Sequence, residues 1–336
     1  MINKLSLSNL FRYKPELTHT SSDGQKYQVT VDSLLANHSF KYFGKDKGVS
    51  MYTFLDDRHS LFYSTVISAS EREAAYVIDG LLHNNVVKSD IHSTDMHGFT
   101  ETIFAATHFI GTSFAPRFKN INQQRIYGFS ARQTYASKGY KLLPSRPINQ
   151  SIIREHWEDI LRFITTIKLK EASASVLLRR LNSYAKDHPL YKAMKEFGRI
   201  IKTQFILTYI DELPLRQHIE KQLNKVELSN KFAKAVFFEK NQEFTVATRE
   251  EQELVANCKS LIQNAIVLWN YLYLSQLIIN TKNRSDKITL LKTIQNGSML
   301  TWQHVNMRGE YDFTKSANST NFDMHKILAL KMEEVG

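Results

Sequence analysis

Two aspartates stand far apart along this chain, in settings that would let them meet in a folded protein. Asp23 lies in the motif SSDG, just before or within an expected strand, and Asp95 lies in STDMHG at the end of another. Sheets of α/β proteins usually bind their ligands at the C-terminal ends of their strands. A magnesium site needs carboxylates from different elements, because Mg²⁺ prefers oxygen ligands and keeps several waters. Asp23 and Asp95 are therefore candidate metal ligands.

A third carboxylate, from a helix that closes the sheet, would complete such a site. Glu227 in QLNKVELSNKFAKAV is one candidate, but Glu212, Glu220 and Glu239 lie near it in the sequence, and geometry does not select among them. Plainer roles also compete, because Asp-Gly is more often a turn and Asp before a helix is more often a cap. The residues alone leave both interpretations open.

The spacing of apolar residues indicates the elements that would position these carboxylates. We expect, in chain order, strands at 26–32, 49–55 and 61–68, a helix at about 71–84 opened by a capping box of Ser70 and Glu73, a strand at 89–94, a helix at 100–111 and a strand-like segment at 113–118. This order predicts an α/β fold with a ribonuclease H-like mixed sheet core.

After Phe118 the pattern becomes helical. Helices are expected at 154–169, 172–185, 191–209, 214–238 and about 251–280. We therefore predict a helical insertion before the last catalytic helix. The predicted division is 1–130 for the first part of the core, 131–212 for the insertion, 213–300 for the rest of the core and 301–336 for a polar tail.

The composition points to a polyanionic partner. The chain has 336 residues with 44 Lys and Arg against 33 Asp and Glu, a formal charge of +11. Its single Cys excludes an internal disulfide and a zinc finger, and favours a cytoplasmic location. The amides within the uncharged stretch 260–281 indicate a buried helix and no membrane span. His92, His97 and His108 are interpreted as structural residues, because no soft ligands accompany them.

Cations at helical spacing are candidate DNA contacts. The first group forms one stripe of a predicted helix and consists of Lys192, Lys195, Arg199 and Lys202. The second group lies on the predicted helix that carries Glu227 and consists of Lys221, Lys225, Lys231 and Lys234. Arg117 is a weaker candidate. A solvated surface is the competing interpretation. Among the tryptophans, Trp157 and Trp269 lie on apolar helical stripes and are expected in the core, although stacking on bases is the alternative.

Several stretches of the sequence resemble, in the same order, the catalytic region of the Tn-three family of replicative (class II) transposases. They are SSDGQKY, KYFGKDKGVSMYTF, STDMHGFTE, REHWEDILR, FGRIIKT, QLNKVELSNKFAKAVFF and AIVLWNYLYL, and the weaker LTWQHVNMRGEYDF is similar to the closing segment. Short motifs such as DG carry no weight alone, whereas the TD-x-HG-x-TE and LNK-x-E blocks together are specific.

The resemblance implies a DDE active site made of Asp23, Asp95 and Glu227. The spacings of 72 and 132 residues leave room for the helical insertion between the second and third carboxylates. The chain departs from the family pattern at Val226, where Gly is usual, at Leu228, where a small residue is common, and at Met96, where Thr is common.

The same resemblance implies a reaction and its partners. Asp23 would bind both of two Mg²⁺ or Mn²⁺ ions, Asp95 would bind one of them, and Glu227 would bind the other. The ions would serve nicking at transposon ends and transfer of the 3′ end to target DNA. The expected partners are terminal inverted repeats, target DNA, a separate N-terminal recognition portion and further copies of the chain on DNA. A non-catalytic DNA-binding remnant and a ribonuclease H-like nuclease without strand joining are the alternatives.

Overall fold

The computed structural model describes residues 1–95, 99–183, 188–237, 242–307, 309–310 and 322–331. Met96, His97 and Glu239 therefore lie outside the described residues. The chain forms two compact units: unit 1 comprises Met1–Thr18, Gly24–Ser70 and Asn224–Gly336, and unit 2 comprises His19–Asp23 and Glu71–Leu223. The first strand contributes residues to both units. The predicted division at 130, 212 and 300 stays a prediction.

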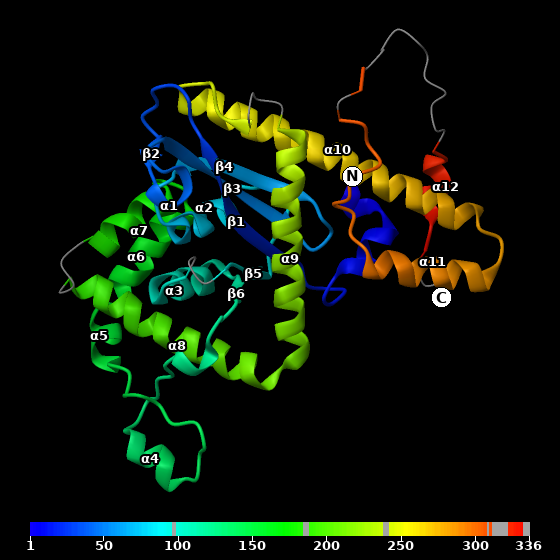
Figure 1. The fold of residues 1–336 in the computed structure, drawn as a ribbon. Coiled ribbons are helices and arrows are strands. Elements are labelled where there is room, and N and C mark those ends of the chain that lie inside the picture. Colours follow the sequence, from blue (N-terminus) through cyan, green and yellow to red (C-terminus); the bar gives the residue numbers. More distant parts are fainter. Residues whose placement is uncertain (96–98, 184–187, 238–241, 308, 311–321, 332–336) are drawn as a thin grey trace. The chain divides into compact units, whose positions relative to one another are not determined.

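The fold is mixed α/β, built on a mixed sheet (Figure 1). Its strands are β1 (His19–Gln28), β2 (Asn37–His38), β3 (Lys47–Asp56), β4 (Leu61–Ser68), β5 (Ile91–Ser93) and β6 (Ser113–Phe114). The strand order is β2-β3-β1-β5-β6, with β4 paired to β3. β2, β3 and β4 pair antiparallel, whereas β1, β5 and β6 pair parallel. This arrangement is consistent with the expected ribonuclease H-like core.

The β3–β4 hairpin of unit 1 confirms the sequence prediction closely. Val49 pairs with Ser68 and Phe54 with Tyr63, and a bulge follows at Phe54 and Leu55. Every residue of β3 after Lys47 is buried, because its apolar side chains face covered surfaces on both sides of the strand. Apolar burial therefore sets the register of this hairpin.

The first strand departs from the prediction. It begins at His19 and ends at Gln28, so the expected span of 26–32 is wrong at both ends. Residues His19 to Ser22 are polar but buried. The side chains of His19, Thr20 and Ser22 bond to β5, and the Ser21 hydroxyl donates to the Gln222 carbonyl. The strand was predicted from the alternation of apolar residues, and the first half of β1 has no such alternation. Asp23 consequently lies inside the strand.

Helices make up most of unit 2. They are α2 (Val77–Leu82), α3 (Glu101–Ile110), α4 (Arg132–Ser137), α5 (Gln150–Glu155), α6 (Trp157–Lys168), α7 (Ala174–Ser183) and α8 (Pro189–Asp211). The expected helix at 154–169 is therefore divided between α5 and α6. Gly198 brings α8 close to α3, because a Cβ there would lie 1.7 Å from the Glu101 carbonyl oxygen. Figure 1 shows the two helices packed together within this unit.

The capping box expected at Ser70 and Glu73 is wrong. Ser70 bonds instead to the Ser68 hydroxyl, and a short 3-10 helix (η3, Glu73–Tyr76) precedes α2 without a side-chain cap. Asp79 has a different role, because its carboxylate accepts the Ala174 and Ser175 N–H groups at the start of α7. Ser70 thus makes a local contact instead of a cap, and Asp79 caps α7 and not its own helix.

The remaining helices lie in unit 1, except that α9 begins in unit 2. They are α9 (Leu213–Val236), which spans the division between the units, α10 (Arg249–Asn280), α11 (Arg284–Asn296) and α12 (Met324–Ala329). Unit 1 also contains η1 (Ile2–Lys4), η2 (Ser6–Phe11) and α1 (Phe40–Phe43) near the start of the chain. A capping box of Thr248 and Glu251 opens α10. Among the described residues, no helix is long and apolar enough to cross a membrane.

The uncharged part of α10, from residue 260 onward, carries several amides that bind main-chain groups. Asn264 binds both the N–H and the C=O of Leu61 on β4, at 3.0 and 2.8 Å. Gln263 donates to the Ser229 carbonyl, and Asn270 donates to the Met299 and Thr301 carbonyls. These amides satisfy main-chain groups that burial would otherwise leave without partners.

Candidate active site

The parallel pairing of β1 and β5 brings two of the predicted carboxylates into register. Ser21 lies opposite Ser93, and Asp23 and Asp95 each follow two residues later. The Arg117 N–H donates to the Thr94 carbonyl at 3.0 Å, so hydrogen bonding to the next segment continues past the end of β5. Residues two apart share one face, and neighbouring strands lie about 4.8 Å apart. Asp23 and Asp95 thus each stand two residues beyond the last opposed pair, with Asp23 still in β1 and Asp95 past the end of β5.

Buried side-chain hydrogen bonds fix this register. His92 lies between the Thr20 and Ser22 hydroxyls, with 2.8 Å from each ring nitrogen to one of them. His19 bonds to the Ser93 hydroxyl at 2.7 Å. Burial lowers the pKa of His92 to about 3, so its imidazole is neutral and one nitrogen accepts while the other donates. His92 is thus structural, as predicted.

Arg117 joins Asp95 to the helix that carries Glu227. Its Nη2 lies 3.2 Å from Asp95 Oδ1, and its Nη1 lies 3.0 Å from Glu220 Oε1 on α9. Burial alone would lower the pKa of the Arg117 guanidinium, but the charges of Asp95 and Glu220 raise it above its usual value. Arg117, predicted as a DNA contact, thus has an ion-pair role that the sequence did not indicate.

Glu227 is an exposed residue on α9 in unit 1, seven residues after Glu220. Seven residues are about two helical turns, so the two glutamates share one face of the helix. Val226 beside it is buried, and α9 continues without interruption from Leu213 to Val236. Among the described residues, no group of three or more His, Cys, Asp and Glu side chains is placed to hold a metal ion.

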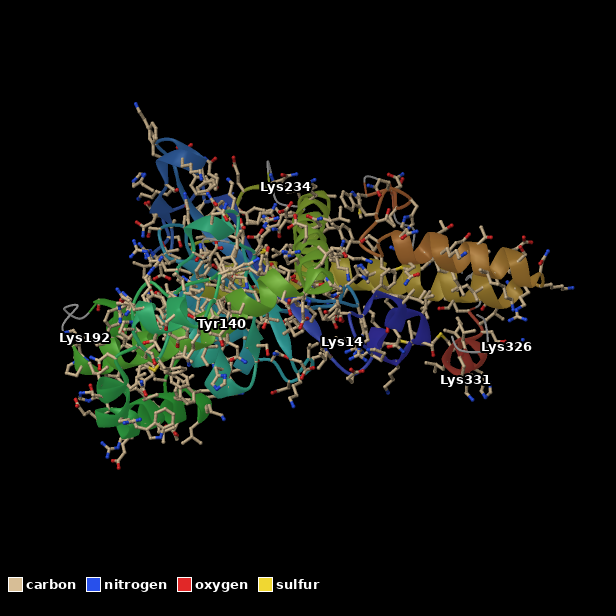
Figure 2. The ribbon with its side chains drawn as sticks, turned by 90° about the horizontal axis from the view of Figure 1, so that it is seen from below. Lys14, Tyr140, Lys192, Lys234, Lys326 and Lys331 are labelled. Atoms are coloured by element: carbon tan, nitrogen blue, oxygen red, sulfur yellow. The ribbon has the colours of Figure 1, made fainter. Side chains whose placement is uncertain are left out.

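The first predicted basic stripe turns inward along α8. Lys192 is exposed at its start and is labelled in Figure 2, and Lys195 is half-buried. Arg199 is bonded to Glu196, and the buried Lys202 lies 3.7 Å from Glu101. The start of the stripe is thus accessible to DNA, whereas its end forms ion pairs inside unit 2.

The cations near Glu227 also divide by burial. Lys221, Lys231 and Lys234 are exposed, and Figure 2 labels Lys234. Lys225 is buried, and its ammonium donates to the Asp57 carbonyl at 2.6 Å. The same ammonium lies 5.7 Å from the centre of the Phe11 ring. Lys225 therefore has a structural contact within unit 1.

The core packing expected for Trp157 and Trp269 is wrong. Each is 38% exposed. Trp157 packs against Phe109 and Phe197, whereas Trp269 stacks on Tyr273. An apolar stripe in the sequence indicates that one face of a helix avoids charge, but it does not indicate how completely another element covers that face.

Comparison with known proteins identifies the family. The sequence model of the family Tn3 transposase DDE domain matches residues 1–311. The chain is 36% identical over 297 residues to the transposase for transposon Tn1546 of Enterococcus faecium, an alignment that covers 88% of this chain and 30% of that protein. It is 34% identical over 300 residues to the transposase for transposon Tn501 of Pseudomonas aeruginosa, covering 89% of this chain and 30% of that protein.

The chain therefore belongs to the Tn3 transposase DDE domain family, a catalytic family that acts on DNA in transposition. A further relative, the transposase for transposon Tn21 of Escherichia coli, is 33% identical over 303 residues, which cover 89% of this chain and 30% of that protein. The chain thus spans about 30% of the length of these relatives.

Proposed function

We propose that this chain carries a DDE active site in which Asp23, Asp95 and Glu227 hold divalent ions for cutting and joining DNA. The observation that carries the proposal is the register of β1 and β5, in which Asp23 and Asp95 each follow the opposed pair Ser21 and Ser93 by two residues. Family membership supports it, because the resemblance to this family implies a DDE site at these three residues. The reaction would be nicking at transposon ends, followed by transfer of the 3′ end to target DNA.

The resemblance to the family implies Glu227, in the block LNK-x-E, as the third carboxylate. Glu227 is exposed on α9 in unit 1, so its side chain is accessible to solvent.

The donor set suits magnesium or manganese. Three carboxylates offer only oxygen ligands, which these hard cations prefer, and two of the three come from neighbouring strands. When bound, the ions would stabilise negative charge on the phosphoryl oxygens and lower the pKa of an attacking water. Arg117 pairs with Asp95 through a charged hydrogen bond, so it would compete with a bound ion for that carboxylate.

The exposed cations would hold the DNA backbone. Lys192, Lys221 and Lys231 are exposed and Lys195 is half-buried, so these four are the proposed phosphate contacts. Each neutralised phosphate releases counterions and adds affinity that falls with salt. The ion-paired Arg199 and the buried Lys202 and Lys225 would contribute less, because their side chains are engaged inside the protein.

Further parts of the proposal concern architecture and partners. The core would be ribonuclease H-like, with the helices between β6 and α9 as the helical insertion. The DNA partners would be terminal inverted repeats and target DNA. The chain would act on DNA as a homo-oligomer, together with a separate N-terminal recognition portion.

The test is nicking of labelled terminal-repeat DNA by the purified chain with Mg²⁺ or Mn²⁺. We expect Asp95→Asn to lower the nicking rate by at least about a thousandfold, because one metal ligand loses its charge. Asp159→Asn is the matched control, since the Asp159 side chain is 46% exposed and that of Asp95 is 47% exposed, both in unit 2. Full nicking by Asp95→Asn would reject the assignment.

A substrate with a pre-nicked end separates the proposed transposase from a nuclease. The proposal expects the free 3′ hydroxyl to join target DNA in the presence of Mg²⁺. Nicking without joining would favour the nuclease alternative, and binding without either reaction would favour a non-catalytic remnant.

A further inference from the structure

Residues 126–148 of unit 2 form a closed excursion from the helical part of the unit, here called the basic lobe. Main-chain hydrogen bonds close its neck: Ser145 N–H donates to the Ile126 carbonyl at 2.9 Å, and Ile148 N–H donates to the Gly128 carbonyl at 2.8 Å. α4 lies within the lobe and projects from the rest of unit 2 in Figure 1. The lobe is therefore a defined structural feature with a fixed base.

Buried polar contacts attach this neck to α8. Glu196 of α8 is buried, and its carboxylate accepts Arg146 Nη2 at 2.5 Å and the Asn149 N–H at 3.1 Å. The Tyr127 N–H donates to the Thr203 hydroxyl at 3.0 Å. The Arg146 guanidinium also lies 5.4 Å from the centre of the Tyr127 ring. The base of the lobe is thus positioned by a rigid helix.

A cavity of about 650 Å³ lies between the lobe and α8. Its aromatic and basic lining includes Tyr127, Phe129, Tyr135, Tyr140 and Lys141, and Leu207 closes it from α8. Figure 2 views the molecule from below, the side on which α4 lies in Figure 1, and labels Tyr140 of the lobe. The volume falls within the range of about 300–1,000 Å³ that is usual for small-ligand sites.

Two of the aromatic rings are held in place before any ligand binds. The Tyr135 hydroxyl accepts the Phe129 N–H at 3.0 Å. Gly128 makes room for the Tyr135 ring, because a Cβ at Gly128 would lie 2.7 Å from a carbon of that ring. The Tyr135 and Tyr140 ring centres are 6.0 Å apart. A ligand would therefore meet a wall that is already ordered.

The lobe is also free of negative charge in its sequence. From Lys119 to Arg154 the chain has seven Lys and Arg residues and no Asp or Glu. Arg132, Lys138 and Lys141 of the lobe are exposed. Phe129 and Tyr140 are 56% and 59% exposed despite lining the cavity. Exposed aromatic rings on a lobe whose own charged side chains are all cations match a ligand that is both flat and anionic.

We propose that this cavity binds an unpaired nucleobase of DNA, with neighbouring phosphates on the exposed cations of the lobe. This inference rests on the proposed function, because it concerns the same DNA. Stacking of a base on an aromatic ring contributes about 1–3 kcal/mol and tolerates any base, and cations supply the phosphate contacts. An apolar protein segment would use the rings but would gain nothing from the acid-free lobe.

The experiment measures binding of the full chain to two DNA duplexes without divalent ions. One duplex is fully paired, and the other contains a single unpaired 2-aminopurine. We expect binding to be roughly tenfold tighter for the second duplex, and the 2-aminopurine fluorescence to be quenched by stacking. Tyr140→Ala should remove the preference and the quenching while the affinity for the paired duplex is kept.

Two further variants keep the test informative. Leu207→Trp fills the cavity from α8 without removing a lobe residue, and it should abolish the same preference. Tyr42→Ala is the matched control, because Tyr42 is 53% exposed but lies in unit 1, and it should leave the preference unchanged. Thermal melting of each variant verifies folding.

The outcomes separate this inference from the proposed function. Equal affinity for both duplexes, or an unchanged preference in both Tyr140→Ala and Leu207→Trp, would overturn the inference and leave the cavity to an apolar protein segment. If the chain also nicked DNA with Mg²⁺, only the inference would fall. Absence of any DNA binding by the unmodified chain would overturn both proposals.

Discussion

The β3–β4 hairpin and the β1–β5 pair hold their registers by opposite means. In the hairpin, apolar residues such as Val49, Met51 and Phe54 are buried. In the β1–β5 pair, buried hydroxyls and the neutral His92 connect the strands through side-chain hydrogen bonds. Apolar packing tolerates small shifts, whereas hydrogen bonds of 2.8 Å require definite geometry. The pair that carries two candidate catalytic residues is thus the one with directional contacts.

Removing an apolar ring from the hairpin should have the largest effect on stability. Phe54 is fully buried and packs edge-on against Tyr52 and Tyr63. We expect Phe54→Ala to lower the free energy of unfolding by about 3–5 kcal/mol, measured by urea denaturation. Phe62→Ala is the control, because Phe62 is only half-buried on the neighbouring strand, and its loss should be clearly smaller. Equal losses would contradict an apolar origin for the stability of β3.

Removing the ring nitrogens of His92 from the β1–β5 pair should lower stability by a smaller amount. His92→Phe keeps an aromatic ring beside Phe114 but leaves the Thr20 and Ser22 hydroxyls without the partner they have now. We expect a loss of about 2–3 kcal/mol in the free energy of unfolding, because buried hydroxyls that lose a hydrogen bond are destabilising. Under the proposed function, nicking should fall by more than the folded fraction does. A variant as stable and active as the unmodified chain would show that these bonds do not fix the register.

This difference also explains how far the sequence could predict the fold. The hairpin concentrates β-forming residues in two runs joined by polar residues, so its strands and its turn at Asp56–His59 were predictable. The first half of β1 reads HTSSD and resembles a loop, because its burial depends on partners 69 to 74 residues away. A single sequence does not reveal such tertiary hydrogen bonds.

The stability contributions of Asp56 in the hairpin and of His92 in the β1–β5 pair should change with pH in opposite directions. Burial, and then the charge of Asp57, raise the pKa of Asp56 in the hairpin turn to about 7, despite hydrogen bonding from the Ser60 N–H. Native Asp56 therefore binds a proton that the unfolded chain releases, and stability falls as the pH rises from about 4 to 7. His92 has a lowered pKa of about 3 in the native state, so its contribution is lost as the pH falls from 6.5 toward 3.

Single variants should expose these opposing slopes, each at most about 1.4 kcal/mol per pH unit. Relative to the unmodified chain, Asp56→Asn should make stability rise more steeply with pH between 4 and 6.5. His92→Phe should make stability fall with pH over the same interval. Urea denaturation at pH 4, 5, 6 and 7 measures both slopes, and parallel profiles for all three proteins would contradict the assignment.

The candidate site was predictable to a different extent from its surroundings. Asp23, Asp95 and Glu227 followed from a family resemblance, whereas composition alone left them among ordinary turns, caps and surface glutamates. The pairing of Arg117 with Asp95 and Glu220 was not predictable, because 22 and 103 residues separate the partners. The aromatic and acid-free composition of residues 126–148 was visible in the sequence, but only the folded neck and α8 make it a cavity.

Substitution of Arg117 should have the smallest effect on stability. It also tests how the β1–β5 pair presents Asp95 to the candidate site. The Arg117 partners Asp95 and Glu220 are about half-exposed, so Arg117→Met should change the free energy of unfolding by less than about 1 kcal/mol. Removing this cation also removes a competitor for the Asp95 carboxylate and a charge that repels Mg²⁺. The Mg²⁺ concentration for half-maximal nicking should therefore fall several-fold. A rise instead would mean that Arg117 mainly positions Asp95, and that the β1–β5 pair needs this ion pair as well as its buried hydrogen bonds to present the carboxylate.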